Sequence, residues 1–359
     1  MCSKSFPLAT RTTCDALTLI KTSLLNAIAV SVRVLTLLGI NKILSVYVGP
    51  TGYAALGQFQ NAVQMISTLA NGAINTGVTK YTAEYYEDEA KQRAVWQTAG
   101  SIALTGSIFL SLLVFIFRAD LSYWFLNDAS LGIVFGWFAA TLVLFVFNTL
   151  LLAIINGKKD IHRYVLANIT GSVFALLITG IMVMNWGLLG ALVALAVYQS
   201  LAFFVTLALC FKTSWFRITY LFGRLDKEVV SNLAKYTAMA LTSAAMVPLS
   251  HILIRNHLGE TLGWKAAGYW EAMWRLSGAY LMLVTSTLSV YYLPRLSELK
   301  TRAEIRQEII AGYRLILPVA VVCSLLVYLL RENLILGLFS QEFLPMSELF
   351  FWQLIGDVI

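Results

Sequence analysis

The chain has 359 residues, of which 58% are hydrophobic and only 13% are charged, and its formal net charge is +7. Soluble domains carry about 25% charged residues, so this composition indicates a protein that crosses a membrane several times. The Lys and Arg residues occur in small groups between apolar runs, which argues against the concentrated basic patch of a nucleic-acid-binding protein.

Apolar segments long enough to be membrane spans recur along the chain, since a helix needs about 20 apolar residues to cross a hydrocarbon core of about 30 Å. A polar extension, residues 1–16, comes first, and we expect it to be disordered. The first apolar run is too long for a cleavable signal peptide, so we predict a retained span. The predicted spans are 20–47, 54–80, 95–117, 131–156, 163–184, 187–211, 235–256, 266–293, 310–330 and 346 to the end.

Cysteine and histidine spacing gives no indication of a cofactor. The 4 cysteines are scattered without a C-x-x-C pair, and the 3 histidines form no H-x-x-x-H pair. We therefore expect neither a disulfide framework nor a metal site.

Basic residues alternate between the two sides of the predicted spans. Nineteen Lys and Arg residues fall in the loops of one side, whereas the other side has only Arg118, Arg255, Lys265 and Arg331. The positive-inside rule then places the N-terminus in the cytoplasm. Loops on the opposite side, such as VGPTGY and NWG, are little more than turns, which leaves no room for a soluble catalytic domain.

The longest cytoplasmic connector, residues 212–232, divides the chain into an N-terminal six-helix lobe (17–211) and an incomplete C-terminal lobe (233–359). The connector mixes aromatic and basic residues and is predicted to be an amphipathic segment at the membrane surface. A short repeat supports two related halves: VGP-TGYAALGQFQNA (48–62) aligns with LGETLGWKAAGYWEA (258–272) when one gap is placed after Pro50. The alignment pairs Gly57 with Gly268 and Gln60 with Glu271. Repeated halves are typical of transporters that hold a substrate between them near the midplane.

Charged residues inside the predicted spans point to a polar cavity. At 1.5 Å per residue, Glu271 lies about 8 Å and Arg275 about 14 Å inside the membrane. Arg33 and Asp357 are also predicted near the middle of their spans, and Lys42 lies near the outer end of the first. Each such charge facing lipid would cost about 2.5–3.5 kcal/mol at the bilayer centre, so these side chains must pair or line a cavity.

Two explanations of these charges remain open. Glu271 and Arg275, at i and i+4, could neutralise each other as a structural pair, and Asp357 could be the partner of Arg33 across the bundle. Alternatively, the arginines bind phosphate oxygens in a cavity through their planar guanidinium groups, and the carboxylates exchange protons there.

Polar residues also recur along the second span at helical spacing, and on a continuous helix they would share one face. Hydrogen bonding between helices would explain one or two of them, whereas a full-length stripe favours a wall for hydroxyl-rich cargo. Lys80, at the cytoplasmic end, is an interface anchor or a ligand, and Trp270 is a belt residue or a sugar-stacking platform. The stripe consists of Gln60, Gln64, Ser67, Thr68, Asn71, Asn75 and Thr79.

Four runs resemble a known family: NTGVTKYTAEYYEDE (75–89), KYTAMALTSAAMVPLSHILIRNHLG (235–259), STLSVYYLPRLSEL (286–299) and FFWQLIGDVI (350–359). They are similar to the O-antigen and lipid III flippases of Gram-negative inner membranes, the polysaccharide transport branch of the multidrug/oligosaccharidyl-lipid/polysaccharide exporter superfamily. The resemblance implies twelve helices in two lobes, and alternating access that moves an undecaprenyl-pyrophosphate-linked oligosaccharide to the periplasmic leaflet. A glycan polymerase and chain-length proteins would be candidate partners. The chain ends within the tenth helix of this pattern, so we expect a truncated C-terminal lobe.

We therefore predict an all-α polytopic flippase and not an enzyme. Family members line a central cavity with cationic residues, and depth assigns this role to Arg33 and Arg275, which would hold the pyrophosphate. A multidrug exporter of the same superfamily would need an anionic cavity, and a membrane-embedded glycan polymerase or ligase would need a sizeable periplasmic loop. The remaining predicted site residues are Gln60, Gln64, Asn71, Asn75 and Trp270 for the sugar, and Glu271, Asp357, Lys42 and Lys80 for coupling or for the cavity wall.

Overall fold

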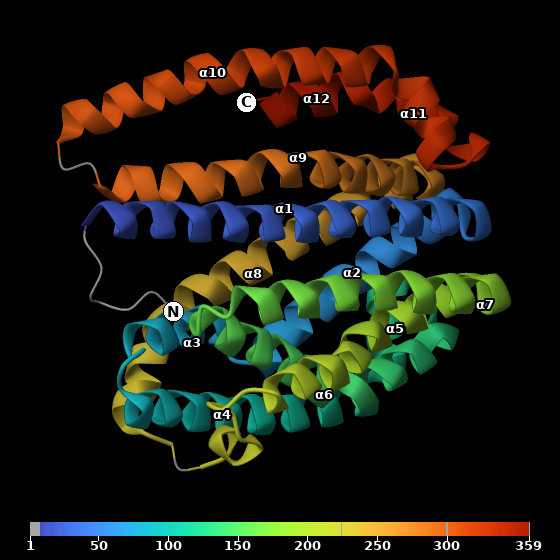
Figure 1. Ribbon diagram of the computed structural model, residues 1–359. Helices are drawn as coiled ribbons and strands as arrows, with labels where there is room; N and C mark the ends of the chain where they lie inside the picture. The colour runs from blue at the N-terminus through green and yellow to red at the C-terminus, as the bar shows by residue number, and fades with distance from the viewer. Residues whose placement is uncertain (1–7, 224, 299–300, 359) are drawn as a thin grey trace.

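The computed structural model describes residues 8–223, 225–298 and 301–358, which form helices and loops without a strand (Figure 1). The α-helices are α1 (Leu8–Tyr47), α2 (Gly49–Ala70), α3 (Asn75–Glu84), α4 (Glu89–Ile116), α5 (Arg118–Leu126), α6 (Gly132–Gly157), α7 (Ile161–Phe211), α8 (Lys227–Leu262), α9 (Trp264–Glu298), α10 (Arg302–Leu329), α11 (Arg331–Leu338) and α12 (Phe350–Val358). Three 3₁₀ segments connect them: η1 (Ala129–Leu131), η2 (Ile218–Leu221) and η3 (Gln341–Leu349).

Several of these helices are suited to a bilayer. Within the described residues, 4 helical segments are individually long and apolar enough to span it, and two bent helix pairs also qualify when each pair is joined. The chain is therefore a multi-pass membrane protein. The 4 segments are Ile28–Tyr47, Glu89–Ile116, Ala129–Gly157 and Ile161–Phe211.

Helix α7 is a hairpin of two spans. Its 51 residues would measure about 76 Å if straight, more than twice the hydrocarbon thickness of about 30 Å. Gly187 interrupts it with φ 53° and ψ −130°, a conformation that glycine adopts readily. The Arg163 Nη2 donates to the Lys212 carbonyl oxygen at 3.4 Å, so the two ends of α7 adjoin. The separate spans predicted at 163–184 and 187–211 are confirmed.

The second predicted span, 54–80, is not continuous, and that prediction is wrong. The chain breaks between α2 and α3, where Gly72 and Ala73 have φ of +64° and +53°. The Asn71 side chain stabilises the break, because its Oδ1 accepts from the Ala73 backbone N–H at 2.7 Å. Left-handed residues cannot continue a right-handed helix, so the predicted polar stripe is divided between two helix axes.

The ends of the chain also differ from prediction. Helix α1 begins at Leu8, so residues 8–16 of the expected disordered extension are helical, while residues 1–7 lie outside the described residues. Extending a formed helix costs less than nucleating one, which accounts for the added turns. The last predicted span is divided between η3 and the nine-residue α12.

The connector packs on the N-terminal lobe. Between α7 and α8 its described regular structure is the 3₁₀ segment η2. The Trp215 ring lies 5.7 Å from that of Trp96 on α4, and the Phe222 ring lies 5.8 Å from that of Phe147 on α6. Aromatic residues of the connector therefore pack against α4 and α6, and its location at the membrane surface stays a prediction.

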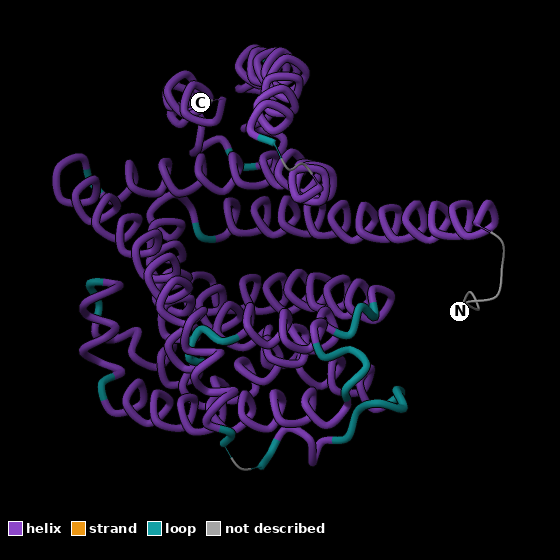
Figure 2. Tube along the Cα trace, turned by 90° about the vertical axis from the view of Figure 1, so that its left-hand side faces the viewer, coloured by secondary structure: helices purple, strands orange, loops and turns teal. Residues whose placement is uncertain are grey.

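Two groups of helices form the two lobes. Helices α4, α6 and α7 pack into the core of the N-terminal lobe, and α1 lies between α7 and α9 (Figure 1). In the turned view of Figure 2 the C-terminus lies at one extreme of the molecule. Helices α2 and α9, the second helix of each predicted half, make one of the most extensive contacts between the lobes.

Glycine makes that contact possible. A Cβ on Gly268 would lie 1.8 Å from the Pro50 carbonyl oxygen, and one on Gly57 would lie 2.4 Å from the carboxyl carbon of Glu271. Small residues allow membrane helices to approach this closely. Gly57 and Gly268 are also aligned in the sequence repeat, so equivalent positions of the two halves form the contact between them.

We expect Gly268→Ala to destabilise the purified protein, because the added methyl group forces α2 and α9 apart. Overpacking of this kind costs on the order of 1–3 kcal/mol, which thermal unfolding in detergent would detect. Gly278→Ala, on the same helix, is the control, since its added Cβ meets nothing within 4 Å. Equal melting temperatures for the two variants would contradict the close approach.

Candidate functional site

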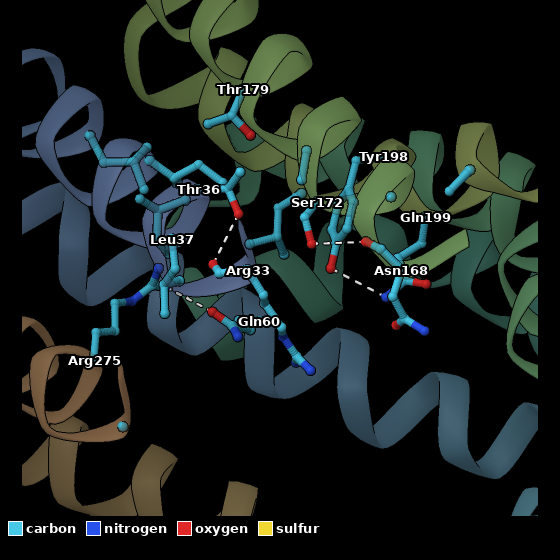
Figure 3. Close-up of a pocket in the computed structure, with 18 of the residues that line it drawn as sticks. Arg33, Thr36, Leu37, Gln60, Asn168, Ser172, Thr179, Tyr198, Gln199 and Arg275 are labelled. Carbon is cyan, nitrogen blue, oxygen red and sulfur yellow. Dashed lines mark hydrogen bonds between the residues drawn. The ribbon is translucent and has the colours of Figure 1, made fainter. Parts of the chain in front are cut away.

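A cavity of about 450 Å³ lies between the lobes, with walls from α1, α2, α6, α7 and α9. Small-molecule sites commonly have volumes of about 300–1,000 Å³. The two lobes both contribute to it, because α9 belongs to the C-terminal lobe and the other four helices to the N-terminal lobe. Its polar lining includes Asn148 and the residues labelled in Figure 3: Arg33, Thr36, Gln60, Asn168, Ser172, Thr179, Tyr198, Gln199 and Arg275.

The two predicted cationic residues line this one cavity. Arg33 comes from α1 and Arg275 from α9, although 242 positions separate them in the sequence. Arg33 is exposed, and within the described side chains it has no ion-pair partner. A guanidinium group that is open to the cavity and unpaired is available to an anionic ligand.

Arg275 is held by residues of both halves. Its Nε donates to Glu271 Oε1 at 2.7 Å, which confirms the predicted i, i+4 pair, and its Nη2 donates to Gln60 Oε1 at 2.8 Å. Gln60 and Glu271 are aligned positions of the sequence repeat. The repeat therefore places two acceptors on one guanidinium, one from each half.

A third arginine, Arg255, was not among the predicted site residues. The sequence analysis counted it with the basic residues of the non-cytoplasmic side, at the end of the span 235–256, but α8 continues to Leu262 and the residue is only 1% exposed. Its Nε lies 3.0 Å from Glu271 Oε2, and its Nη1 donates to Gln58 Oε1 at 2.7 Å. The available signal was the absence of proline between Arg255 and Gly263, which allowed a longer helix.

Glu271 thus bridges two guanidinium groups, and the three side chains carry a formal charge of +1. Each carboxylate oxygen faces one arginine, and the Glu271 side chain is only 5% exposed. Charges this far from water need such mutual pairing, because an isolated buried ion loses its hydration without compensation. Structural pairing therefore explains Glu271 and Arg255, while Arg275 both pairs and lines the cavity.

Asp357 connects α12 to α9. Its Oδ2 accepts from the hydroxyls of Ser277 and Tyr280, and its Oδ1 accepts from Gln353 Nε2 at 3.0 Å. The suggested pairing of Asp357 with Arg33 is therefore wrong. Three neutral donors on α9 and α12 satisfy the carboxylate in place of a distant arginine.

Of the predicted stripe, only Gln60 lines the cavity. Gln64 is exposed elsewhere on α2, Asn71 stabilises the break after α2, and Asn75 begins α3. Trp270 does not line the cavity either, but stacks at 6.0 Å on Trp274, which does. The break at residues 71–74 places Asn75 and Thr79 on a separate helix, α3, whereas Gln64, Ser67 and Thr68 precede the break on α2 and are still outside the cavity lining.

The two predicted lysines also lie outside the cavity lining. The Lys42 Nζ donates to the Leu336 carbonyl oxygen at 2.9 Å and to that of Phe339, so it caps the C-terminus of α11. Lys80 is exposed on α3, with its ammonium 5.2 Å from the centroid of the Tyr81 ring. Among the described residues, no three His, Cys, Asp or Glu side chains gather into a metal-binding group.

The sequence analysis also missed a neutral wall on α6 and α7. A signal existed, because Asn168, Ser172 and Thr179 follow one another at helical spacing in an otherwise apolar span. Asn148 on α6 and Gln199 on the second arm of α7 line the same side of the cavity. These two residues are linked to each other, because Asn148 Nδ2 donates to Gln199 Oε1 at 3.2 Å.

Comparison with known proteins identifies the family. Residues 19–300 match the family described as polysaccharide biosynthesis protein. The chain belongs to this family. It is 30% identical over 343 residues to the Lipid III flippases of Escherichia coli (strain K12) and Shigella flexneri, an alignment that covers 96% of this chain and 82% of each relative. The predicted resemblance is confirmed.

Solved structures support the predicted two-lobe helical transporter fold. A multidrug resistance MATE family transporter of the MOP superfamily, in its inward-facing conformation, superposes with a TM-score of 0.67 at 15% identity. The match covers 91% of this chain and 80% of that one. The similar proteins are a flippase and transporters rather than enzymes.

We expect Arg255→Met to destabilise the protein, because it leaves Glu271 with one cation fewer in a buried setting. Breaking a buried pair costs about 3–5 kcal/mol, and the double variant Arg255→Met/Glu271→Gln should recover part of that loss. Lys265→Met, at an exposed position near the start of α9, is the control for removal of a charge. Additive losses in the double variant, measured by thermal unfolding, would contradict direct pairing.

Proposed function

We propose that the protein is a flippase that moves an undecaprenyl-pyrophosphate-linked oligosaccharide from the cytoplasmic to the periplasmic leaflet of a bacterial inner membrane by alternating access. The names of its relatives support this cargo, since both are Lipid III flippases. The distribution of basic loop residues supports a cytoplasmic N-terminus. A glycan polymerase and chain-length proteins would then act on the product.

The observation that carries this proposal is the pair of arginines, one from each lobe, in one cavity. A guanidinium group presents several N–H donors in one plane and matches the oxygens of a phosphate group. Arg33 is unpaired among the described residues, and the Glu271 bridge leaves Arg275 within a net positive cluster. The cavity therefore suits a pyrophosphate.

Only the polar headgroup needs the cavity. The polyprenyl chain can stay in the lipid, because removing apolar surface from water stabilises it by about 0.8 kcal/mol for each CH₂. The headgroup would cross between walls that belong to different lobes, Arg33 on α1 and Arg275 on α9. Movement of one lobe against the other would then change the distance between the two arginines and so the affinity for the pyrophosphate.

The two rival functions fit less well. A multidrug exporter of the same fold would take cationic compounds, which two arginines in the cavity would repel. A glycan polymerase or ligase is disfavoured because the similar proteins are transporters.

Coupling to protons would involve Asp357 more readily than Glu271. The partners of Asp357 are the neutral side chains of Ser277, Tyr280 and Gln353, so protonation breaks no ion pair. Protonation of Glu271 would break its ion pairs with both arginines. Asp357 also lies at the contact of α12 with α9, whose own Arg275 lines the cavity.

Replacement of either cavity arginine by alanine should reduce export of surface glycan in a strain lacking the native gene. Loss of a charged hydrogen bond of about 1.5–3 kcal/mol predicts a decrease of roughly 10- to 150-fold, with lysine at the same position restoring part of the rate. Arg118→Ala removes an exposed arginine outside the cavity and should export normally. Normal export by both Arg33→Ala and Arg275→Ala, at equal protein levels in the membrane, would refute the proposal.

Asp357→Asn should abolish the dependence of export on the proton gradient, because an amide cannot carry the proton. Glu271→Gln should lower the amount of folded protein but leave that dependence in the remainder. Export measured with and without a protonophore, and normalised to folded protein, separates the two residues. Retained dependence in Asp357→Asn would exclude it from coupling.

A further inference from the structure

The cavity has a second wall whose chemistry differs from that of the arginines. It is formed by Asn148 on α6 and by Asn168, Ser172, Tyr198 and Gln199 on α7, and we call it the amide wall. Every one of these side chains is neutral. Figure 3 shows Asn168, Ser172, Tyr198 and Gln199 together on the α7 side of the cavity.

Asn148 leaves one acceptor of this wall without a partner. The residue is 3% exposed, and its Nδ2 donates to Gln199 Oε1 at 3.2 Å. Its Oδ1 is buried and has no hydrogen-bond partner. A buried acceptor left unpaired costs about 1–3 kcal/mol, which a donor brought by a ligand would recover.

Tyr198 supplies a donor in the same wall. Its hydroxyl oxygen accepts from Gln199 Nε2 at 3.3 Å, which commits a lone pair but not the hydroxyl hydrogen. Within the described part of the chain, no side chain or carbonyl accepts that hydrogen. The Gln199 amide thus links the open acceptor of Asn148 to the open donor of Tyr198.

We propose that the amide wall is the subsite for the sugar nearest the pyrophosphate, where it binds a hydroxyl or acetamido group. This assignment rests on the proposed function, since the sugar and the pyrophosphate belong to the same headgroup of the proposed cargo. An acetamido N–H or a hydroxyl donates to Asn148 Oδ1, and a carbonyl or hydroxyl oxygen accepts from Tyr198. The arginines bind the pyrophosphate, which every cargo shares, and the amide wall selects the glycan.

Unpaired polar groups are what make such a subsite selective. A site built to hydrogen-bond a substrate group rejects an analogue that lacks the group, because its own buried polar atoms then stay unpaired. The arginines cannot discriminate in this way, since a pyrophosphate presents the same oxygens whatever sugar it carries. Selectivity between glycans therefore depends on the amide wall.

The experiment compares two ligands on the purified full chain in lipid nanodiscs. One is undecaprenyl pyrophosphate, and the other is undecaprenyl pyrophosphate bearing a single N-acetylhexosamine. Their dissociation constants define a sugar ratio, the affinity of the second ligand divided by that of the first. Asn148→Leu should lower this ratio by about fivefold, the effect of one hydrogen bond, and leave undecaprenyl pyrophosphate binding unchanged.

Tyr198→Phe deletes only the hydroxyl and keeps the ring, so it tests the wall even if Asn148→Leu folds poorly. It should lower the sugar ratio as well. Tyr164→Phe is the matched control, because it deletes a hydroxyl on the same helix outside the cavity lining, and it should keep the wild-type ratio.

Three results overturn one idea or the other. A wild-type sugar ratio in both Tyr198→Phe and folded Asn148→Leu refutes the subsite and indicates that the wall binds only water. A reduced ratio in Tyr164→Phe as well refutes the assignment to the wall. Unchanged binding of both ligands by both Arg33→Ala and Arg275→Ala refutes the pyrophosphate site and hence the proposed function, whatever the sugar ratio shows.

Discussion

One carboxylate, Glu271, determines how the centre of the molecule is assembled. It lies between the guanidinium groups of Arg255 and Arg275, at 3.0 and 2.7 Å, and so ties α8 to α9. Gly57 lets it reach α2, because any side chain there would occupy the space of the carboxyl group. The bridge has three consequences: it gives both guanidinium groups a counter-charge, brings the second helices of both halves together, and fixes Arg275 at the edge of the cavity. The cationic wall of the cavity therefore depends on an anion that is not itself in the cavity lining.

The division of the cavity into a cationic and a neutral wall follows from this assembly. Helices of both lobes line the cavity, so any relative movement of the lobes would change its shape. The same two-lobe fold occurs in multidrug transporters, and the fold alone does not specify a cargo. We therefore base the proposed cargo on the side chains of the walls: guanidinium groups suit an anionic headgroup, and the open amide and hydroxyl of the amide wall suit a sugar.

Local sequence features predicted a large part of this arrangement. Apolar length placed the spans, including the hairpin at Gly187, and depth within the spans brought Arg33 and Arg275 to one cavity although they are far apart in the chain. The sequence did not predict the helix break or the contacts between side chains of separate helices. The break at Gly72 depends on two positive φ angles that a regular polar spacing conceals. Arg255 and Asp357 acquire their partners only when separate helices pack, and sequence distance carries no information about those contacts.

A structure of the full chain with an undecaprenyl-pyrophosphate-linked sugar bound would test the central claim most directly. Density for the diphosphate should lie within hydrogen-bonding distance, about 2.7–3.2 Å, of the guanidinium nitrogens of Arg33 and Arg275. The first sugar should extend from it toward Asn148 and Tyr198. A headgroup bound outside this cavity, with both arginines free of phosphate contacts, would contradict the account.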